Sequence, residues 1–458
     1  MQSPDVFKKH DFRTPTVQQK RSSKNLFVSK KLGRLFRTNE LEFLDDQLLQ
    51  FPQGLFMLIS AELFSGLAAQ YGTPLYLLDV QKVLGAMNTL RDGLSIHYPN
   101  SEITYSVKTN YLSHILRQVL SHGYRLEVVS RHEMMLAQEN GAQPNQLLLN
   151  GPVKSLEDLN YCYQHSIDLN LDSVDELQAA TTIGTLDKPF RLGLRAAATL
   201  KNGNISRFGI DFGDSDAVGQ IRKLAQNPCI DVVGLHTHHS SRRDAQSYCD
   251  RIDHLSQIAE LLEIKPKYLD IGGGVGSTPP PEIAAQLTYP IDDPKQLATI
   301  IGKHAFEKWG SQGPRIILEP GIAVLAESMN YLTRIVSVKN RGAGQIAVCD
   351  GSLFDVNPLR STVHPPCHLL TSNDDPSEPS AEPTRLYGGT CMEIDQIGTL
   401  PVGRTPRPGD LVHVSNVGAY SACLAPQFII PPAPIYSVDS QKIVRQRPTL
   451  GNFIGAGK

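Results

Sequence analysis

The sequence has no long apolar run, no excess of one charge and no closely spaced cysteine pairs. None of its apolar stretches approaches the roughly 18 residues that a membrane-spanning helix needs. Its 44 lysines and arginines nearly balance its 46 aspartates and glutamates, so there is no overall attraction to nucleic acid or to an anionic membrane. The seven cysteines are odd in number and lack CxxC spacing, which is typical of reduced thiols. We therefore expect a cytoplasmic protein that binds neither membranes nor nucleic acid.

The 458 residues suffice for two or three domains, and the first part differs in composition from the rest. Ten lysines and arginines lie in the first forty positions, against only three acids. This composition favours a flexible basic extension over residues 1–60. An organelle-targeting segment is the alternative, but Asp5, Asp11 and the lack of a clear amphipathic stripe weaken it.

Short apolar segments alternate with helical patterns from Glu102 onward. The predicted strands are Ile103–Lys108, Leu126–Val129, Gln146–Asn150, Asp168–Asp172, Arg191–Arg195, Val232–Thr237, Tyr268–Ile271 and Arg315–Glu319. Eight strands with intervening helices predict an α/β fold, with a (β/α)8 TIM-like barrel over residues 61–328. A doubly wound sheet is the alternative, although the count of eight favours the closed barrel.

After Glu319 the helical periodicity stops. Segments such as Tyr331–Lys339, Gly344–Cys349 and Asp410–Val414 read as strands separated by Gly, Pro and Asp. We therefore predict a mostly β C-terminal domain over residues 329–458.

The C-terminal ends of barrel strands carry the reactive residues in such folds. Lys108 closes the first predicted strand, where burial can lower the pKa of its amine and make it nucleophilic. Glu127 and Arg195 lie at the ends of the second and fifth strands, and Glu319 ends the eighth. These side chains are candidates for one common site.

Two histidines mark the end of the sixth predicted strand. His236 and His238 share a face and could bind a metal, but no acid or cysteine in the sequence completes an evident ligand set. We therefore predict no metal site, and favour a stacking or hydrogen-bonding role for a histidine here.

The seventh predicted strand is followed by Gly272, Gly273 and Gly274, whose backbone N–H groups can approach an anion. Loops after the seventh and eighth strands are the usual phosphate site of a barrel. A lysine, a stacking histidine, a phosphate cradle and a carboxylate at one mouth fit pyridoxal 5′-phosphate (PLP). Its aldehyde would bind the lysine, its phosphate the glycines and its ring nitrogen the carboxylate.

With these motifs the sequence resembles the PLP-dependent decarboxylases of the diaminopimelate and ornithine decarboxylase family, which join an alanine-racemase-like barrel to a β domain. The similarity covers roughly residues 65 to 430. It includes LAAQYGTPLYLLD (Leu67–Asp79), YSVKTN, EVVSRHE and SRFGID (Ser206–Asp211). The resemblance implies that Lys108 holds PLP covalently and that Glu127 supports the stacking histidine.

The resemblance also assigns the remaining cofactor contacts. His238, in HHSS, would stack on the cofactor ring, and Ser241 would bond its phosphate together with the three glycines. Glu319 would bind the pyridine nitrogen, and Tyr420, in GAYS, would contact the phosphate. We count Arg195 among the candidate cofactor contacts as well.

The segment GGTCMEIDQIG resembles the motif whose cysteine enters the active site of the partner subunit. Cys391 is therefore the candidate proton donor to the substrate carbon. This implies a homodimer with shared active sites.

Three positions depart from the family pattern. Ile322 replaces the arginine of EPGR that binds phosphate, and Ser240 replaces the glycine of HxGS. Arg242 and Arg243 are possible substitutes for the missing cation, or contacts of the substrate. Met392 replaces the acid that meets a distal ammonium of the substrate, although Glu393 and Asp395 are near.

Met392 cannot form an ion pair, which makes simple diamino acids less suitable substrates. We expect a decarboxylase of a modified amino acid, such as citryl-diaminopropionate in citrate-based siderophore assembly. The alternatives are a diaminopimelate decarboxylase proper, an amino-acid racemase on the same barrel, or a catalytically silent relative that binds a partner protein. Glu319 argues against a racemase, because racemases of this fold generally place an arginine at the pyridine nitrogen.

Overall fold

The computed structural model describes residues 53–200, 203–239, 242–342, 344–370, 379–380 and 382–453. Most of the predicted basic extension therefore lies outside the described residues, and its end belongs to helix α3 (Gln53–Tyr71). No helix within the described ranges is long and apolar enough to cross a membrane.

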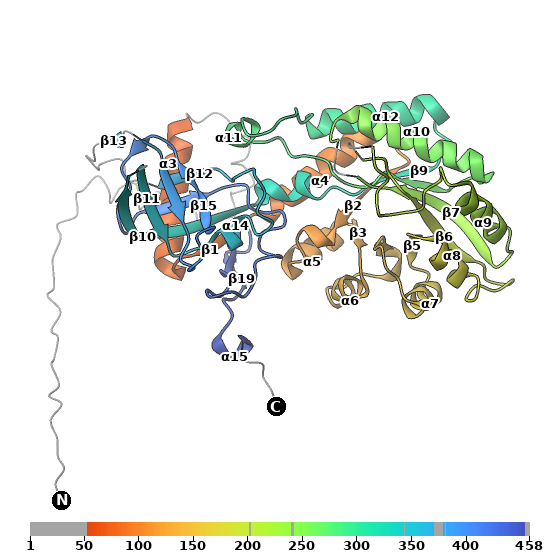
Figure 1. Cartoon of the computed structure of the whole chain (residues 1–458), viewed down its shortest axis with the longest axis horizontal. Coiled ribbons are helices and arrows are strands. Elements are labelled where there is room, and N and C mark those ends of the chain that lie inside the picture. Colours follow the sequence, from red (N-terminus) through yellow and green to blue (C-terminus); the bar gives the residue numbers. More distant parts are fainter. Residues whose placement is uncertain are drawn as a thin grey trace, which may run out of the picture. The chain divides into compact units, whose positions relative to one another are not determined.

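Eight parallel strands close into a barrel, as the sequence predicts (Figure 1). Each strand pairs with the next one along the chain, and the first pairs with the eighth to close the barrel. The strands are β2 (Ser101–Ser106), β3 (Arg125–Val128), β4 (Leu147–Leu149), β5 (Asp168–Leu171), β6 (Phe190–Ala196), β7 (Ile230–Thr237), β8 (Tyr268–Asp270) and β9 (Arg315–Leu318).

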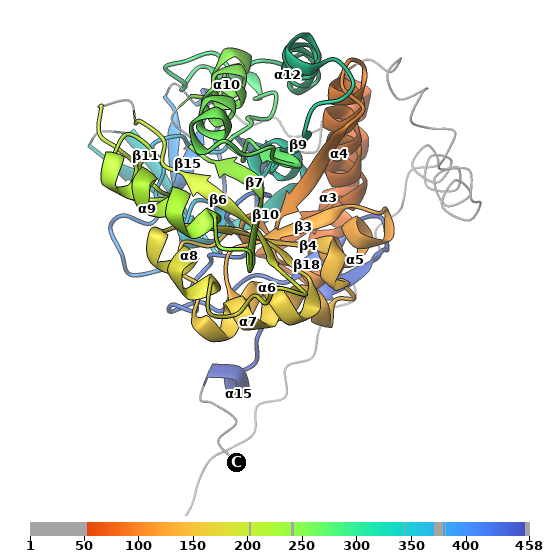
Figure 2. The same ribbon diagram turned by 90° about the vertical axis from the view of Figure 1, so that its right-hand side faces the viewer.

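Helices surround these strands because their apolar stripes pack on the outward side chains of the barrel (Figure 2). The longer ones are α4 (Val80–Ser95), α5 (Ser113–Ser121), α6 (Arg131–Glu139), α7 (Leu156–His165), α8 (Val174–Ala180), α9 (Ser215–Ala225), α10 (Ala245–Leu262) and α12 (Pro294–Trp309). Short turns complete the layer: η2 (Val107–Thr109), η3 (Pro144–Gln146), α11 (Pro281–Ala284), α13 (Ile322–Leu325) and η4 (Ala326–Ser328).

A mostly β domain follows the barrel, and its main sheet has nine strands. They are β1 (Leu75–Leu78), β10 (Met329–Arg341), β11 (Gly344–Cys349), β12 (Cys367–Leu370), β14 (Thr384–Tyr387), β15 (Gln396–Leu400), β17 (Leu411–Val414), β18 (Ile435–Ser437) and β19 (Lys442–Arg445). A two-stranded sheet and two short helices complete it: β13 (Pro379–Ser380) with β16 (Gly403–Arg404), α14 (Leu353–Val356) and α15 (Leu450–Phe453).

Strand β1 precedes the barrel in the sequence, yet it pairs antiparallel with β10 and parallel with β18. The residues before the barrel therefore belong to the sheet of the C-terminal domain. The chain thus forms a strand of this sheet first, then the barrel, and then the remaining strands of the sheet. The domain boundaries 61–328 and 329–458 remain a proposal.

Tyr268 fills part of the barrel interior, where it packs with Leu148, Val233 and Ile317 and against two glycines. Tyr268 on β8 lies within 2.4 Å of where a Cβ at Gly234 or Gly193 would be. Its hydroxyl donates to Asn170 Oδ1 at 2.8 Å, on the opposite side of the barrel. Glycines on β6 and β7 therefore make room for the ring, and polar side chains begin directly above it.

We predict that Gly93→Ala destabilises the protein by about 1–3 kcal/mol, because α4 and α12 cross in close contact there. A Cβ at Gly93 would lie 2.8 Å from the Lys295 carbonyl oxygen and 2.9 Å from Ala298 Cβ. Gly85→Ala on the same helix is the control, since no atom lies within 4 Å of its added Cβ. That change should be neutral or stabilising by about 0.5–1 kcal/mol. Urea unfolding followed by circular dichroism measures both, and equal midpoints would contradict the close crossing.

Candidate active site

Lys108 lies in the turn η2, just beyond the end of β2, and its side chain is 31% exposed. The predicted strand Ile103–Lys108 is therefore too long at this end, because the chain turns after Ser106. Asn110 fixes the turn: its side-chain oxygen accepts from the Leu112 N–H at 3.2 Å, and its Nδ2 donates to the Gly418 carbonyl at 3.1 Å. The amine is thereby presented at the barrel mouth.

Glu127, at the end of β3, accepts a hydrogen bond from Lys108 Nζ and is only 1% exposed. Burial alone would lower the pKa of Lys108, as the sequence suggests. The attraction of Glu127 and Glu319 outweighs burial and raises that pKa above its ordinary value. In the cofactor-free protein, Lys108 is therefore held as a cation.

Glu319 and Asp270 follow β9 and end β8, respectively, and both are fully buried. The amide of Asn150 donates to both carboxylates, at 3.0 Å to Asp270. Burial, together with the charges of Asp270 and Glu127, raises the pKa of Glu319 well above its ordinary value. Burial likewise raises the pKa of Asp270 to about 6.

His236 on β7 completes this buried group, with its Nε2 3.9 Å from a Glu319 oxygen. Neither ring nitrogen has a hydrogen-bond partner within the described residues. Burial lowers the pKa of His236 well below its ordinary value, so the ring is neutral. One ligand atom each from His236, Asp270 and Glu319 lie within 4.8 Å of one another. The predicted absence of a metal site therefore stays a prediction.

His238 and the glycine turn are packed together at the mouth. The Gly273 N–H donates to His238 Nδ1 at 2.8 Å, which sets the orientation of the imidazole ring. A Cβ at Gly272 would lie 2.7 Å from the Thr237 carbonyl oxygen, and one at Gly273 would lie 2.3 Å from that of Glu319. Any side chain would therefore displace the turn. Ser241 lies outside the described residues, so its predicted role stays a prediction.

Tyr420 reaches the same place from the C-terminal domain. Its backbone N–H donates to the Thr109 carbonyl at 3.0 Å, and its φ of 57° lies in the left-handed region. Cys423 Sγ lies 3.2 Å from the same carbonyl oxygen. The segment around Tyr420 is thereby attached directly next to Lys108.

The arginines predicted near the mouth differ in their surroundings. Arg195 is buried and forms an ion pair with Asp172 at 3.2 Å. Arg242 is exposed and lies 3.2 Å from both Asp244 and Asp250. Arg243 has a buried Nε without a partner among the described residues.

Arg243 lines a cavity of about 250 Å³ between the barrel and the C-terminal domain. The cavity adjoins the site on three sides: Gly276 follows the glycine turn, Ile322 follows Glu319, and Ala419 precedes Tyr420. Its described polar lining consists of neutral side chains and this one cation, without a carboxylate: Ser277, Tyr289, Asn357, Ser361, Asn416 and Ser421.

The remaining predicted residues lie between β14 and β15. Cys391, Met392 and Glu393 are exposed. Asp395 is buried and accepts hydrogen bonds from the Leu353 N–H, Ser352 and Thr390. These bonds give Asp395 a role in holding its own loop.

A family model described as the pyridoxal-binding domain of pyridoxal-dependent decarboxylases matches residues 84–326, slightly more than half of the chain. The chain belongs to the pyridoxal-dependent decarboxylases. It is a PLP-dependent amino-acid decarboxylase, and PLP is its cofactor.

Curated relatives and solved structures agree with this family. The chain is 24% identical to the diaminopimelate decarboxylase of Methanothermobacter thermautotrophicus, over 85% of this chain and 92% of the relative. It is 27% identical to that of Actinosynnema pretiosum, over 79% and 83%. The Helicobacter pylori diaminopimelate decarboxylase complexed with L-lysine has the same fold, with a TM-score of 0.72, 21% identity and coverage of 85% and 98%. A Paramecium bursaria Chlorella virus arginine decarboxylase gives a TM-score of 0.68 at 20% identity, over 82% of this chain and all of that one.

The side chains of this decarboxylase fit its cofactor. The turn at Gly272 and Gly273 has no room for a Cβ, and the protonated form of Glu319 is favoured at the barrel centre. The partnerless ring nitrogens of His236 lie in the same buried group. An amine, an imidazole, a carboxylate and a glycine turn are thus present around one mouth.

Several residues of the site were not identified from sequence. Asn150, Asn170 and Asp270 connect the acids at the barrel centre, and Asn170 Nδ2 donates to Asn150 Oδ1 at 2.7 Å. Each is a polar residue in or next to a short apolar strand, at an inward position. This alternation was the available signal. Arg251 and Tyr248 lie on a helix behind the glycine turn, and no motif marks them.

We predict that Glu127→Gln lowers the pKa of Lys108, since its nearest negative charge is lost while its burial remains. In the cofactor-free protein at pH 8, acylation of Lys108 should then rise by up to about tenfold for each pKa unit lost. Peptide mass spectrometry measures the rate. Glu176→Gln is the matched control, because it removes the 3.0 Å ion pair of Lys154 instead. An unchanged rate at Lys108 in Glu127→Gln would show that Glu127 does not hold the amine charged.

Proposed function

We propose that this decarboxylase acts on an amino acid whose distal end carries carboxylate groups, with citryl-diaminopropionate as the substrate to test first. The observation that carries this proposal is the cavity beside the cofactor site. Its described lining has one cation, Arg243, several neutral hydrogen-bonding groups and no acid. Such a lining suits a carboxylate and offers nothing to a distal ammonium.

The ring end of the cofactor is proposed to lie at Glu319. Asn150 holds this carboxyl group in place, and its raised pKa lets it keep a proton available to the pyridine nitrogen. When bound, PLP supplies an acceptor for the electron pair that remains after the carboxylate leaves. His238, oriented by the Gly273 N–H, would stack on the ring.

Lys108 is proposed to bind the cofactor covalently through Nζ. This atom must first lose a proton, and the adjacent Glu127 carboxylate is the group placed to accept it. The same carboxylate can return that proton when the substrate amine displaces Lys108. The glycine turn, Ser241 and Tyr420 are proposed to hold the phosphate.

Cys391 is proposed to protonate the substrate carbon in a second copy of the chain. It is exposed on the loop between β14 and β15, so its thiol is accessible to a partner. Each active site would then need both subunits, which makes the enzyme a homodimer.

We predict that heterodimers of Lys108→Ala and Cys391→Ala subunits regain up to about half of the native activity, because one of their two sites then has both groups. Each parent variant alone should be nearly inactive, because every site then lacks one of the two groups. Differently tagged subunits, purified through both tags, provide proven heterodimers for a CO2-release assay. Cys423→Ala replaces Cys391→Ala in the control pairing. Heterodimers without recovered activity would contradict shared sites.

For substrate choice, we predict a kcat/KM for citryl-diaminopropionate at least about 100-fold above those for diaminopimelate, ornithine, lysine and arginine. The reason is the lining of the cavity, together with Met392 in the loop that carries Cys391. Release of CO2 by PLP-loaded protein is measured across this panel, with Lys108→Ala as the inactive control.

Two arginine variants make this experiment sharper. Arg243→Met should raise KM for the citryl compound by about tenfold or more, while Arg242→Met should change it little, because Arg242 is paired with two acids. Efficient turnover of an unmodified diamino acid would instead indicate a diaminopimelate-type decarboxylase of primary metabolism.

A further inference from the structure

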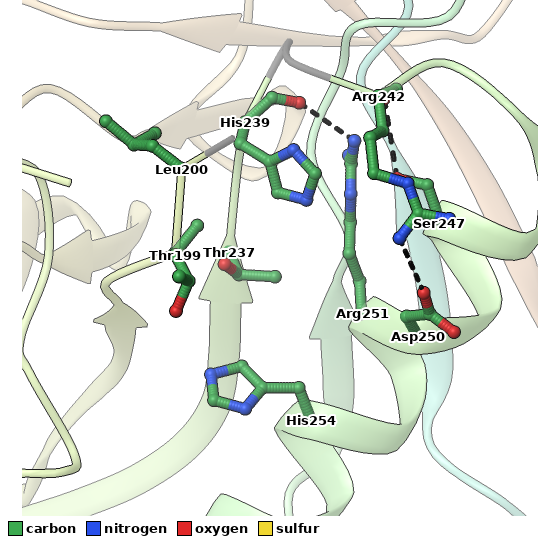
Figure 3. A pocket seen from close by; sticks show the side chains of 10 residues that line it. Thr199, Leu200, Thr237, His239, Arg242, Ser247, Asp250, Arg251 and His254 are labelled. Atoms are coloured by element: carbon green, nitrogen blue, oxygen red, sulfur yellow. Dashed lines mark hydrogen bonds and ion pairs between the residues drawn. The ribbon is translucent and has the colours of Figure 1, made fainter. Parts of the chain in front are cut away.

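Arg251 on α10 is buried behind the glycine turn, with only 2% of the residue exposed. Its guanidinium donates to three backbone carbonyls, those of Ile271 at 2.7 Å, Gly273 at 2.9 Å and His239 at 2.8 Å. Figure 3 shows the side chain rising from the helix to the His239 carbonyl. One side chain therefore connects the turn after β8 with the segment after β7.

Tyr248 supports the same carbonyl from one helical turn earlier. Its hydroxyl donates to the Gly273 oxygen at 3.1 Å, and the Arg251 guanidinium lies 4.1 Å from the centre of its ring. Residues three apart share a helix face, so both side chains point toward the turn. The Gly273 carbonyl is thus directed toward α10 by two donors.

This arrangement fixes the direction of the next amide. In a trans peptide the C=O and N–H point in opposite directions, so the Gly274 N–H is directed away from α10. The N–H groups of Gly272 and Gly273 are bound by Asp270 and His238, whereas that of Gly274 has no partner within the described residues. Gly274 therefore offers the amide that is available to an anion.

Arg251 also lacks a carboxylate in direct contact. Other arginines of the barrel face acids, as the partly buried Arg125 does with Asp168 at 2.7 Å and the buried Arg195 with Asp172 at 3.2 Å. No carboxylate lies within 4.0 Å of Arg251 among the described residues. A buried cation without a carboxylate in contact is costly, and this one lies directly behind a turn that leaves room for an anion.

We propose that Arg251 is a positioning residue for the cofactor phosphate, acting from behind the glycine turn both by orienting its amides and as the counter-charge of the phosphate. The proposal rests on the proposed function, because it takes the glycine turn as the phosphate site. It also explains how the site can bind a phosphate with Ile322 in place of an arginine. Arg251 balances the phosphate charge in place of Arg242, whose own charge is already balanced by two acids.

The test compares the affinity of the cofactor-free protein for PLP and for pyridoxal, which lacks the phosphate. Arg251→Met should weaken PLP binding by about 30-fold or more and pyridoxal binding by less than about threefold. Absorbance titration measures both. In phosphorus NMR of bound PLP, the ionisation of the phosphate should shift to higher pH in the variant, because the dianion loses its nearest cation.

Three further variants separate charge from packing. Arg251→Lys keeps the charge and should retain most of the preference for PLP, as should Tyr248→Phe, which removes only one hydrogen bond. Arg125→Met is the control: it removes a partly buried arginine elsewhere in the barrel, which binds the Leu147 carbonyl at 2.8 Å and faces acids. The preference should not change. If Arg251→Lys lost as much preference as Arg251→Met, or if Arg251→Met kept it, the proposal would be overturned.

The failure of this proposal can be told apart from that of the proposed function. The cofactor site itself is wrongly assigned if the unaltered protein binds PLP no better than pyridoxal. It is also wrongly assigned if Lys108→Ala leaves the affinities for both compounds unchanged. If the unaltered protein prefers PLP strongly and Arg251→Met preserves the preference, only the role of Arg251 fails.

Discussion

Three carboxyl groups buried at one end of the barrel set the terms for the rest of the site. Glu127, Asp270 and Glu319 are each at most 2% exposed, and burial, together with the charges of the other two acids, raises the pKa of Glu319 well above its ordinary value. Buried acids are tolerated only when each has partners. Asn150 donates to Asp270 and Glu319, the Gly272 N–H donates to Asp270, and the Lys108 cation donates to Glu127. A ligand that brings a basic nitrogen to Glu319 therefore relieves a strain that the fold itself creates.

The barrel makes this arrangement possible by its internal filling. Gly193 and Gly234 leave space for the ring of Tyr268, whose hydroxyl supports Asn170. Asn170 in turn donates to Asn150, which holds Glu319. The apolar lower interior and the polar mouth are therefore connected by one chain of hydrogen bonds. Its geometry depends on glycine at two strand positions where any side chain would collide with Tyr268.

The sequence predicts the barrel because its signal is periodic and local. Eight short apolar runs, separated by amphipathic segments, lie within one or two residues of most observed strand ends. The position of β1 could not be predicted in this way, because its pairing with β10 joins segments more than 250 residues apart. The predicted end of β2 was also wrong, because the turn at Lys108 is fixed by Asn110 and the distant Gly418.

The site shows the same division between local and distant information. Lys108, Glu319 and the three glycines can be located because strand ends and glycine runs are visible in the sequence. The raised pKa of Lys108 depends on Glu127, which lies on a neighbouring strand, and the role of Arg251 depends on a helix that meets the turn only in three dimensions. Asp395 is a further case of distant information. It was predicted as a substrate contact, but its bonds to Ser352 and Leu353 hold its own loop, and nothing in the local pattern indicates these bonds.

The distribution of charge around the barrel mouth is the last constraint: acids lie at one end of the site and cations at the other. The acids Glu127, Asp270 and Glu319 lie at the barrel centre, whereas the cation Arg251 lies behind the glycine turn and Arg243 lines the adjoining cavity. A cofactor with a protonated ring nitrogen at one end and a phosphate at the other matches this polarity in one orientation only. In the proposed function the same polarity extends to the substrate, whose distal carboxylate would meet Arg243 in the adjoining cavity and be repelled by the acids. The proposed cofactor orientation and the proposed preference for a distal carboxylate thus rest on a single asymmetry of charge.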